Sequence, residues 1–529
     1  MNRSIVLMLL ALICGHIHGQ GPVKLITLPT LDSTTQRVAF IKKPGDGYLI
    51  ATRQAGTTGW GSTMISTDDT GEPQSAARVT DNIPNVILCQ DSGYLMQSAF
   101  NMLVKTDQAL NIQWAKKMVA PLPGLFVNGI YEHDGSYYMT ASVQESLIDP
   151  GLAFYGTYAA IVFKFSAAGD LLDHVILADT IYSSSRYNLY QPTLAFGDDG
   201  SLYLSLNMLQ YWAAGTCNRQ PTVLKLDADL DLQWAYRYPV NIFNSVAGLT
   251  MLHDGNLALS GSYGNNYPYC TYFRNYMQKI DTAGNVLWAK SYQHPDPAGH
   301  GTFPALELAD STLLFSRTVQ DTLGAPVWPF IDHLDANGAV IGSKGFAHPY
   351  GRFNYALMLA DAGDGTLGVC RMNNWDTVLF TTIDTSLTTY CYSVPNTTID
   401  SAISIARQLF SPAYLSYAFT FSDTLYPPFQ PVPFASQPDC GLITGVEEMN
   451  GAGTTVFPNP SAGQVTIAHG VTILELVVTD ALGRIVHRSA PRSNSASVEL
   501  PIAGLYLFRI MDGHRETTTR KVIVEGVNP

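Results

Sequence analysis

Charged residues are scarce in this chain: they make up 14% of the 529 residues, against 46% hydrophobic residues. That balance is too apolar for a disordered chain. Basic residues are the scarcer sign, and the formal net charge of −13 argues against a nucleic-acid partner, because phosphate binding needs a basic surface. After the N-terminus no stretch reaches the roughly 18 consecutive apolar residues of a membrane span, so we expect no transmembrane segment.

Sequence motifs of catalysis are also missing. The chain has no G-x-S-x-G, no HExxH, no phosphate-binding loop and no G-x-G-x-x-G after a predicted strand. A pair of glycosidase carboxylates would leave no such motif, because the fold rather than the spacing brings the two groups together. We therefore name no catalytic residue, and the absence lowers the enzyme interpretation without excluding it.

The N-terminus has the layout of a secretory signal peptide. Arg3 is followed by an apolar run over residues 5–14 and by a short segment that ends at the small residue Gly19. A lipoprotein signal at Cys14 is the weaker interpretation, because a lipidated cysteine follows a small residue and here an isoleucine precedes it. We expect residues 1–19 to be removed and the rest of the chain to be exported.

Three segments share one plan in the same register. Lys105–Met118 reads KTDQALNIQWAKKM, Lys225–Tyr238 reads KLDADLDLQWAYRY and Lys279–Tyr292 reads KIDTAGNVLWAKSY. Shorter copies bring the start positions to 66, 105, 164, 225, 279, 333 and 382. These spacings are too irregular for a tight solenoid, but they suit a propeller whose blades carry loops of different lengths.

A second hairpin signal precedes each copy, usually a tight Asp-Gly turn between two short apolar strands, as in HDGNLALSGS from His253. Two hairpins per unit make a four-stranded sheet. The sequence therefore predicts an all-β fold in which residues 20–444 form a seven-bladed β-propeller.

The repeated residues are expected to be scaffold. The tryptophans are predicted to pack against a neighbouring blade, and the aspartates to cap their own turns rather than to bind calcium. These residues are Trp114, Trp234 and Trp288, and Asp107, Asp227, Asp281 and Asp335. Over residues 36–395 the copies resemble the repeat of quinoprotein-like or WD40-like propellers. That resemblance implies the fold; it does not imply a quinone, because the vicinal cysteine pair of several cofactor-dependent members is missing.

Six cysteines remain after the predicted signal peptide, an even number that permits disulfides in an exported protein. The candidate pairs are Cys217 with Cys270, which precede consecutive copies, and Cys391 with Cys440. Cys89 and Cys370 fall beside apolar strand residues and are expected to be buried thiols. No CxxC or His/Cys spacing suggests zinc, so we expect no metal site and no cofactor.

Ligand binding is expected on the face that collects the connections between second and third strands and those between blades. In the middle repeats these connections are long and aromatic, which suits carbohydrate stacking or a protein interface. The candidate residues are Tyr211, Trp212, Tyr267, Tyr269, Trp328, Arg186, His348 and Arg352. The alternative is that many of these aromatic residues pack the loops onto the propeller.

The chain changes character after Cys440. A polar linker at residues 445–455 precedes alternating strands and Gly or Pro turns over residues 456–529, which predict a small immunoglobulin-like β-sandwich. This segment closely resembles the type A C-terminal sorting domain of the type IX secretion system of Bacteroidetes-like bacteria. The matching residues are Pro458, Asn459, Pro460, Gly463, Asp480, Gly483, Gly504, Tyr506 and Lys521.

The resemblance implies export through the periplasm and recognition by the outer-membrane translocon and its sortase. It also implies removal of the domain, with the cargo anchored to surface lipopolysaccharide or released. We predict that the cargo is a non-enzymatic binding or scaffold module with a glycan or protein ligand. The alternative is a secreted hydrolase or lyase that acts on polysaccharide, and a quinone-dependent dehydrogenase is a distant third.

Overall fold

The computed structural model describes residues 23–27, 35–43, 45, 47–56, 59–98, 101–119, 124–144, 148, 158–179, 187–211, 217–239, 243–264, 273–293, 299–302, 304–319, 328–346, 358–361, 365–372, 377–385, 387, 393–395, 398–440, 455–457, 464–480, 484–500, 504–513 and 517–524. The chain divides into two compact units, Met1–Asp439 and Cys440–Pro529. Within the described ranges every assigned element is a β-strand, so the predicted all-β class is confirmed. Those ranges contain no helix that could span a membrane.

The first unit is built from groups of antiparallel strands that follow one another along the chain. We call each group a meander and number the meanders in chain order. Meander 1 consists of β2 (Thr35–Lys42), β3 (Tyr48–Gly56), β4 (Gly59–Thr67) and β5 (Pro73–Val79). Meander 2 consists of β6 (Asn85–Leu88), β7 (Tyr94–Ser98), β8 (Met102–Thr106) and β9 (Ile112–Val119). Meander 3 consists of β10 (Phe126–His133), β11 (Ser136–Gln144), β12 (Tyr158–Phe165) and β13 (Leu171–Asp179).

The next two meanders share one sheet, joined by a single parallel pair, Arg219 with Phe243. Meander 4 consists of β14 (Tyr187–Phe196), β15 (Leu202–Tyr211), β16 (Cys217–Leu226) and β17 (Leu232–Arg237). Meander 5 consists of β18 (Phe243–Met251), β19 (Leu257–Gly264), β20 (Phe273–Ile280) and β21 (Val286–Gln293).

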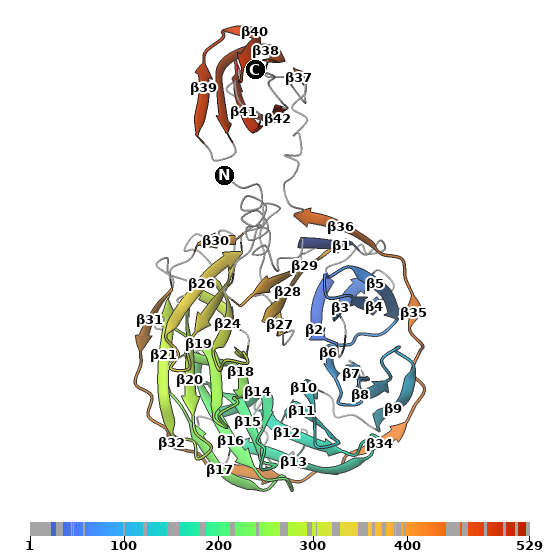
Figure 1. Ribbon diagram of the computed structural model, residues 1–529. Helices are drawn as coiled ribbons and strands as arrows, with labels where there is room; N and C mark the ends of the chain where they lie inside the picture. Colours follow the sequence, from blue (N-terminus) through green and yellow to red (C-terminus); the bar gives the residue numbers. More distant parts are fainter. Residues whose placement is uncertain are drawn as a thin grey trace, which may run out of the picture. The chain divides into compact units, whose positions relative to one another are not determined.

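The remaining meanders bring the chain back to its start. Meander 6 consists of β22 (Gly299–Thr302) and β23 (Leu306–Glu307), which both pair with β24 (Leu313–Val319), and of β25 (Trp328–Leu334) and β26 (Val340–Phe346). Meander 7 consists of β27 (Met358–Asp361), β28 (Thr366–Met372), β29 (Thr377–Asp384) and the N-terminal strand β1 (Val23–Thr27). Figure 1 shows the meanders following one another around a ring.

Residues 393–395 and 398–440 then run back along the outer edges of the meanders in reverse order; we call these residues the belt. Its strands are β30 (Ser393–Pro395), β31 (Ile399–Ala402), β32 (Gln408–Leu409), β33 (Pro412–Leu415), β34 (Thr420–Asp423), β35 (Gln430–Pro431) and β36 (Ala435–Cys440). They add a strand to meanders 6, 5, 4, 3, 2, 1 and 7 in that order. The orange segment at the rim of the ring in Figure 1 is this belt.

The hydrophobic core of the first unit lies between neighbouring meanders rather than inside one of them. One cluster, for example, joins Leu95 and Met118 of meander 2 to Ile161 of meander 3. Corresponding clusters join the other neighbours along the chain. A further cluster joins Phe380 of meander 7 to Tyr48 of meander 1, so the last group packs against the first. Burial of apolar area between the sheets therefore links the meanders into a closed series.

The described residues of the second unit after residue 440 form six strands in one sheet. They are β37 (Thr455–Phe457), β38 (Gln464–Asp480), β39 (Ile485–Ser489), β40 (Ser493–Glu499), β41 (Gly504–Asp512) and β42 (Thr517–Val524). The long strand β38 pairs with β40 along its first half and with β41 and β39 along its second half. Alternate residues of β38 and β41, including Val465, Ile467, Phe508 and Ile510, form a separate core.

Candidate functional site

The first residue of a repeat copy marks an irregularity in the strand pairing in all but the last copy, which starts at Thr382. The register shifts directly after it in six copies, at Ser66, Lys105, Lys164, Lys225, Lys279 and His333. A bulge at this point closes the turn that follows, because it brings the residue five positions after the copy start into a left-handed conformation. That residue is Gly71, Gly169, Gly284 or Gly338 in some copies and Leu110, Leu230 or Leu387 in the others.

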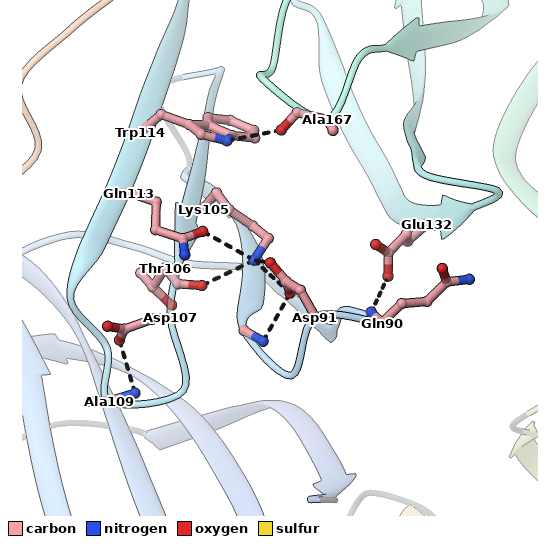
Figure 2. A network of polar contacts seen from close by, with 11 residues as sticks. Gln90, Asp91, Lys105, Thr106, Asp107, Ala109, Gln113, Trp114, Glu132 and Ala167 are labelled. Carbon is pink, nitrogen blue, oxygen red and sulfur yellow. Dashed lines mark hydrogen bonds and ion pairs between the residues drawn. The ribbon is translucent and has the colours of Figure 1, made fainter.

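Polar contacts at this turn tie the two hairpins of a meander together (Figure 2). In meander 2 the Lys105 ammonium lies 2.7 and 2.8 Å from the two carboxylate oxygens of Asp91, which belongs to the preceding Asp-Ser-Gly hairpin. The same Lys105 nitrogen donates to the Thr106 carbonyl and to Gln113. Lys225 with Asp199 and Lys279 with Asp254 repeat the ion pair in meanders 4 and 5.

The repeated aspartates cap their own turns, as the sequence predicts. Asp107 accepts hydrogen bonds from the backbone amides of Ala109 (2.9 Å) and Asn111 (2.8 Å), and the Asn111 side-chain amide bonds its second oxygen. These bonds, led by the one from the Asn111 side chain, lower the pKa of Asp107. Asp227, Asp281 and Asp335 make the same backbone bonds. Their oxygens are therefore occupied by amides of the chain.

The repeated tryptophans bind the next meander, which confirms their predicted packing role. The indole nitrogen of Trp114 donates to the Ala167 carbonyl of meander 3 at 3.2 Å (Figure 2). Trp234 and Trp288 donate to the corresponding carbonyls of Thr282 and Ala336. A β-carbon on Gly169 would lie 2.8 Å from the Trp114 ring, and one on Gly338 would lie 2.7 Å from the Trp288 ring. The turn glycine therefore leaves room for the preceding tryptophan.

At three boundaries the preceding meander lacks the tryptophan, and a leucine occupies the glycine position. The equivalents of the tryptophan in meanders 1, 3 and 6 are Ser75, Asp173 and Gly342. The next turns then carry Leu110, Leu230 and Leu387, each in a left-handed conformation with φ of 60 to 66°. Each leucine joins the hydrophobic cluster shared with the preceding meander. The leucine thus fills the space that Trp114, Trp234 and Trp288 occupy at three other boundaries.

One pair of carboxylates at this end of the meanders, Glu132 and Asp91, has pKa values shifted in opposite directions. Burial raises the pKa of Glu132, which accepts a 2.6 Å hydrogen bond from the Gln90 amide. Burial also acts on Asp91, but hydrogen bonds from Lys105 and the Gly93 amide outweigh it and lower its pKa. Two carboxylates with opposite shifts are typical of a general acid and its partner.

The same carboxylate arrangement recurs elsewhere, which favours a structural role. In meander 6 Glu307 accepts a 2.6 Å hydrogen bond from the His253 amide of meander 5, just as Glu132 accepts one from Gln90. Asp254 and Lys279 stand beside it as Asp91 and Lys105 do. A hydrogen bond from the backbone amide of one meander to a glutamate of the next, found at two boundaries, is a structural contact that holds neighbouring meanders together. Within the described ranges no group of three or more His, Cys, Asp or Glu residues is arranged to hold a metal ion.

The predicted ligand-binding residues fall almost entirely outside the described part of the chain. These are Arg186, Trp212, Tyr267, Tyr269, His348 and Arg352. The backbone places the other two at equivalent connections but on opposite strands: Tyr211 ends the second strand β15, where it pairs with Cys217, and Trp328 begins the third strand β25, where it pairs with Val319. Both therefore stand where a second strand connects to a third, as the sequence predicts.

Other aromatic residues near these connections pack inward. Tyr263 and Tyr276, in β19 and β20, are 5% and 0% exposed, and their rings contact each other at 6.2 Å. Phe330, next to Trp328 in the strand, is 5% exposed. For these three residues the alternative stated for the aromatic face, packing onto the fold, is correct.

Two of the cysteines are resolved by the structure. Cys89 and Cys370 are buried thiols, as predicted. Burial raises the pKa of the Cys89 thiol to about 12, so this group is protonated and is not a nucleophile. The candidate disulfide partners Cys270 and Cys391 lie outside the described residues, and the structure describes only the backbone of Cys217 and Cys440.

The second unit repeats the Asp-capped turn. Asp480, at the end of β38, accepts from the Arg484 amide at 2.9 Å and from its guanidinium at 2.7 Å. Gly504 begins β41, Tyr506 is 5% exposed in the core, and Lys521 lies in β42 opposite Leu507. Pro458, Asn459, Pro460, Gly463 and Gly483 lie outside the described residues.

Residues 455–525 match the family model described as the secretion system C-terminal sorting domain. The chain therefore carries a tail that is recognised by the type IX secretion machinery, and the protein is exported to the cell surface or the extracellular medium. No curated protein sequence matches the chain.

Three of the solved structures to which the chain is similar illustrate the range of this similarity. One is an ulvan lyase of polysaccharide lyase family 25, with 8% identity, a TM-score of 0.46, and coverage of 68% of this chain and 95% of that chain. BamB from Moraxella catarrhalis has 13% identity, a TM-score of 0.35, and coverage of 69% and 99%. PorZ, a surface component of the type IX secretion system of Porphyromonas gingivalis, has 10% identity, a TM-score of 0.21, and coverage of 95% and 100%.

Proposed function

We propose that residues 20–444 form a seven-bladed β-propeller that works as a non-enzymatic binding or scaffold module after export. Each meander is one blade, and β1 completes the last blade from the N-terminal end of the chain. The closed series of hydrophobic clusters supports this arrangement, because meander 7 shares a cluster with meander 1. The repetition of sheets around a closed ring leaves only short, protected strand edges. It also gives the loops a rigid platform.

The main support for a non-enzymatic role is the use that the fold makes of its polar groups. The repeated lysines, aspartates and glutamates at the described turns bond one another or backbone amides. A catalytic carboxylate has to face substrate, and these face their own scaffold. Binding is then left to the opposite ends of the strands, where Tyr211 and Trp328 stand at equivalent connections.

Glycan and protein binding can be tested with a glycan array and a screen of cell-surface partners against the purified protein. Replacing both Tyr211 and Trp328 by alanine is expected to reduce binding of the selected ligand at least tenfold. The matched control is Trp234→Phe, an aromatic change at the other end of meander 4. A ligand whose binding survives the double change but is lost in the control would refute the assignment of the face.

The second candidate is a hydrolase or lyase acting on polysaccharide. The observation that favours it is the opposite pKa shifts of Glu132 and Asp91. Polysaccharide turnover by the wild-type protein that Glu132→Gln abolishes, while the equivalent Glu307→Gln leaves it intact, would establish this alternative. Equal activity in both variants would show that Glu132 and Glu307 have only a structural role.

We further propose that residues 445–455 are a linker and that residues 456–529 form an immunoglobulin-like sandwich. In this proposal the secretion sortase removes the domain, and the cargo is attached to lipopolysaccharide or released. Deleting residues 456–529 is expected to leave the cargo in the periplasm. Normal surface display of the truncated protein, measured by protease accessibility on intact cells, would contradict that expectation.

A further inference from the structure

The belt contacts one fixed position of the repeat in meander after meander. This position lies ten residues after each copy start, directly after the repeated tryptophan where there is one. The backbone amides of Ile403, Phe410, Thr424 and Val432 donate to the carbonyls of Ala289, Ala235, Ala115 and Ala76, each at 3.0 Å. In meander 3 the equivalent His174 bonds the Tyr417 carbonyl, and in meander 6 the equivalent Ser343 bonds Thr398. The belt therefore contacts the same repeat position in each of these six meanders.

The belt also has a period of its own. Its contacts at positions 403, 410, 417, 424 and 432 are seven or eight residues apart. At the ~3.3 Å rise of an extended residue, seven residues span about 23 Å, one step from sheet to sheet along the rim. Two positions after each of these residues stands a second inward-facing residue, namely Ile405, Pro412, Phe419, Tyr426 and Phe434.

The inward-facing belt residues close the gaps between meanders. Ile405, Phe410, Phe419 and Tyr426 are 9%, 3%, 9% and 8% exposed. Each belongs to a different hydrophobic cluster, and each of those clusters is shared by two neighbouring meanders. One belt side chain is therefore buried at each of these four boundaries, where it covers apolar surface that two blades leave at the rim.

Charged groups fix the belt at several points. Lys290 pairs with Asp400 at 2.9 Å, and Lys116 pairs with Asp423 at 2.9 Å. Near its start, Thr398 accepts from Arg317 (2.6 Å) and donates to Asp332 (2.7 Å). Arg317 and Asp332 also form an ion pair with each other, and their side chains are 1% and 0% exposed. Because a buried ion pair is stable only when its remaining polar atoms are hydrogen-bonded, the bonds to Thr398 contribute to its stability.

The belt nevertheless has the features of a segment with low local stability. Its strands are two to six residues long and stand at the ends of their sheets, so they are hydrogen-bonded on one edge. Most of its side chains are exposed, including Leu409 at 75% and Leu425 at 96%. Short, exposed edge segments open at lower free energy than the strands of a buried core.

We propose that the belt is a clasp that opens and closes as a unit on a ring that is already formed. Each belt strand needs a finished outer strand to pair with, so the clasp closes after the meanders have folded. Its last strand, β36, pairs with β1 and so encloses the N-terminal strand between β29 and the belt. A closed clasp also protects its own chain, which precedes the linker and the sorting tail in sequence, from proteases, so removal of the tail leaves the cargo intact.

Hydrogen exchange of the full-length wild-type protein tests whether the belt opens separately. The amides of Ile403, Phe410, Thr424 and Val432 are expected to exchange together and at least about tenfold faster than amides of the buried strands β12 and β15. The ring amides are expected to remain protected while the belt exchanges. Exchange of belt and ring at one common rate would overturn the proposal, because it would make the belt an inseparable part of the core.

A matched pair of variants tests which belt residues hold the clasp. Ile405→Ser with Phe419→Ser removes two buried side chains, whereas Leu409→Ser with Leu425→Ser changes two exposed ones in the same segment. The first variant is expected to be cut by a broad-specificity protease within residues 398–434 at least about tenfold faster, with β12 and β15 still protected from exchange. The second is expected to match wild type. Loss of protection throughout the ring in the first variant, or equal cutting of both variants, would refute the clasp.

Discussion

Two kinds of boundary, three of each, occur between meanders 1 and 7 along the chain, and they fill the same space from opposite sides. Between meanders 5 and 6 a tryptophan crosses the boundary and lies over a glycine turn; Trp288 donates to Ala336, and Gly338 makes room for the ring. Between meanders 3 and 4 Asp173 stands in place of the tryptophan, and Leu230 fills the gap from the other side. At these boundaries the residue at the turn therefore depends on the preceding meander: it is glycine where that meander has a tryptophan and leucine where it does not.

The largest expected effect on stability comes from a change that puts a tryptophan and a turn leucine at the same boundary. Gly338→Leu places a side chain where a β-carbon alone would lie 2.7 Å from the Trp288 ring, at a φ of +74°. Overpacking and left-handed strain together predict a loss of about 3–5 kcal/mol in the free energy of unfolding. Chemical denaturation measures the loss. Gly200→Leu is the control for strain alone, because a β-carbon at Gly200 meets nothing within 4 Å.

Truncating the turn leucine is expected to lower the free energy of unfolding somewhat less. Leu230 is 2% exposed, so Leu230→Ala leaves a cavity at the boundary of meanders 3 and 4 and lowers the free energy of unfolding by about 2–4 kcal/mol. Leu110→Ala is the matched variant at another boundary, where the leucine is only partly buried. Denaturation of both variants checks the order: an equal or larger loss for Leu110 would contradict filling of the gap as the cause.

The two solutions can be exchanged at a single boundary. Trp288→Ala combined with Gly338→Leu reproduces the arrangement between meanders 3 and 4. Each single change is expected to destabilise the protein, and the double variant is expected to be more stable than their sum by about 1–3 kcal/mol. A double-mutant cycle by chemical denaturation measures this coupling. Additive losses would show that tryptophan and leucine do not compete for the same space.

The difference between the boundaries also explains what the sequence could predict. A copy such as KIDTAGNVLWAKSY contains its own turn, bulge and outer strand, so the residues that define it are close together in the chain. The spacing therefore predicts the all-β fold, the role of Asp281 as a cap and the packing of Trp288. It does not predict why some turns carry leucine, because the reason lies about fifty residues earlier, in another sheet.

The belt marks the limit of reading the chain as a single repeat. Its pattern is carried by residues as different as Ile403, Phe410, Tyr417 and Thr424, whose common property is a backbone contact with the outer strand of a meander. Such a pattern cannot be recognised until the acceptor of each contact is known. The repeat copies, the last of which starts at Thr382, therefore give no prediction for the belt. The candidate binding face is limited in a similar way: spacing places Tyr211 and Trp328 at equivalent connections, but whether an aromatic residue packs inward depends on its neighbours in space.

A smaller effect isolates the hydrogen bond that crosses a tryptophan boundary. Trp288→Phe keeps an aromatic ring over Gly338 but removes the donor to the Ala336 carbonyl, which lies 3.2 Å from the indole nitrogen. A loss of about 1 kcal/mol in the free energy of unfolding is expected. Thermal or chemical denaturation of this variant beside Trp288→Ala separates the bond from the packing. A loss as large as that of the alanine variant would assign the whole contribution to the bond.

The smallest effect should not depend on the kind of boundary at all. Asp107 stands in a leucine copy and Asp281 in a glycine copy. For Asp107 the hydrogen bond from the Asn111 side chain lowers the pKa; for Asp281 burial acts the other way, but the bonds from Asn285 outweigh it. A carboxylate with a lowered folded-state pKa stabilises the protein above its unfolded pKa of about 3.9, and this contribution is lost as pH falls through the folded value. Asp107→Asn and Asp281→Asn are therefore each expected to cost about 1 kcal/mol or less at pH 7, with the difference from wild type shrinking at acid pH. Denaturation of the two variants at both pH values measures it. A cost that stays constant with pH would mean that the charge of the cap contributes nothing, and a cost confined to one copy would mean that the turn, too, is set by its neighbour.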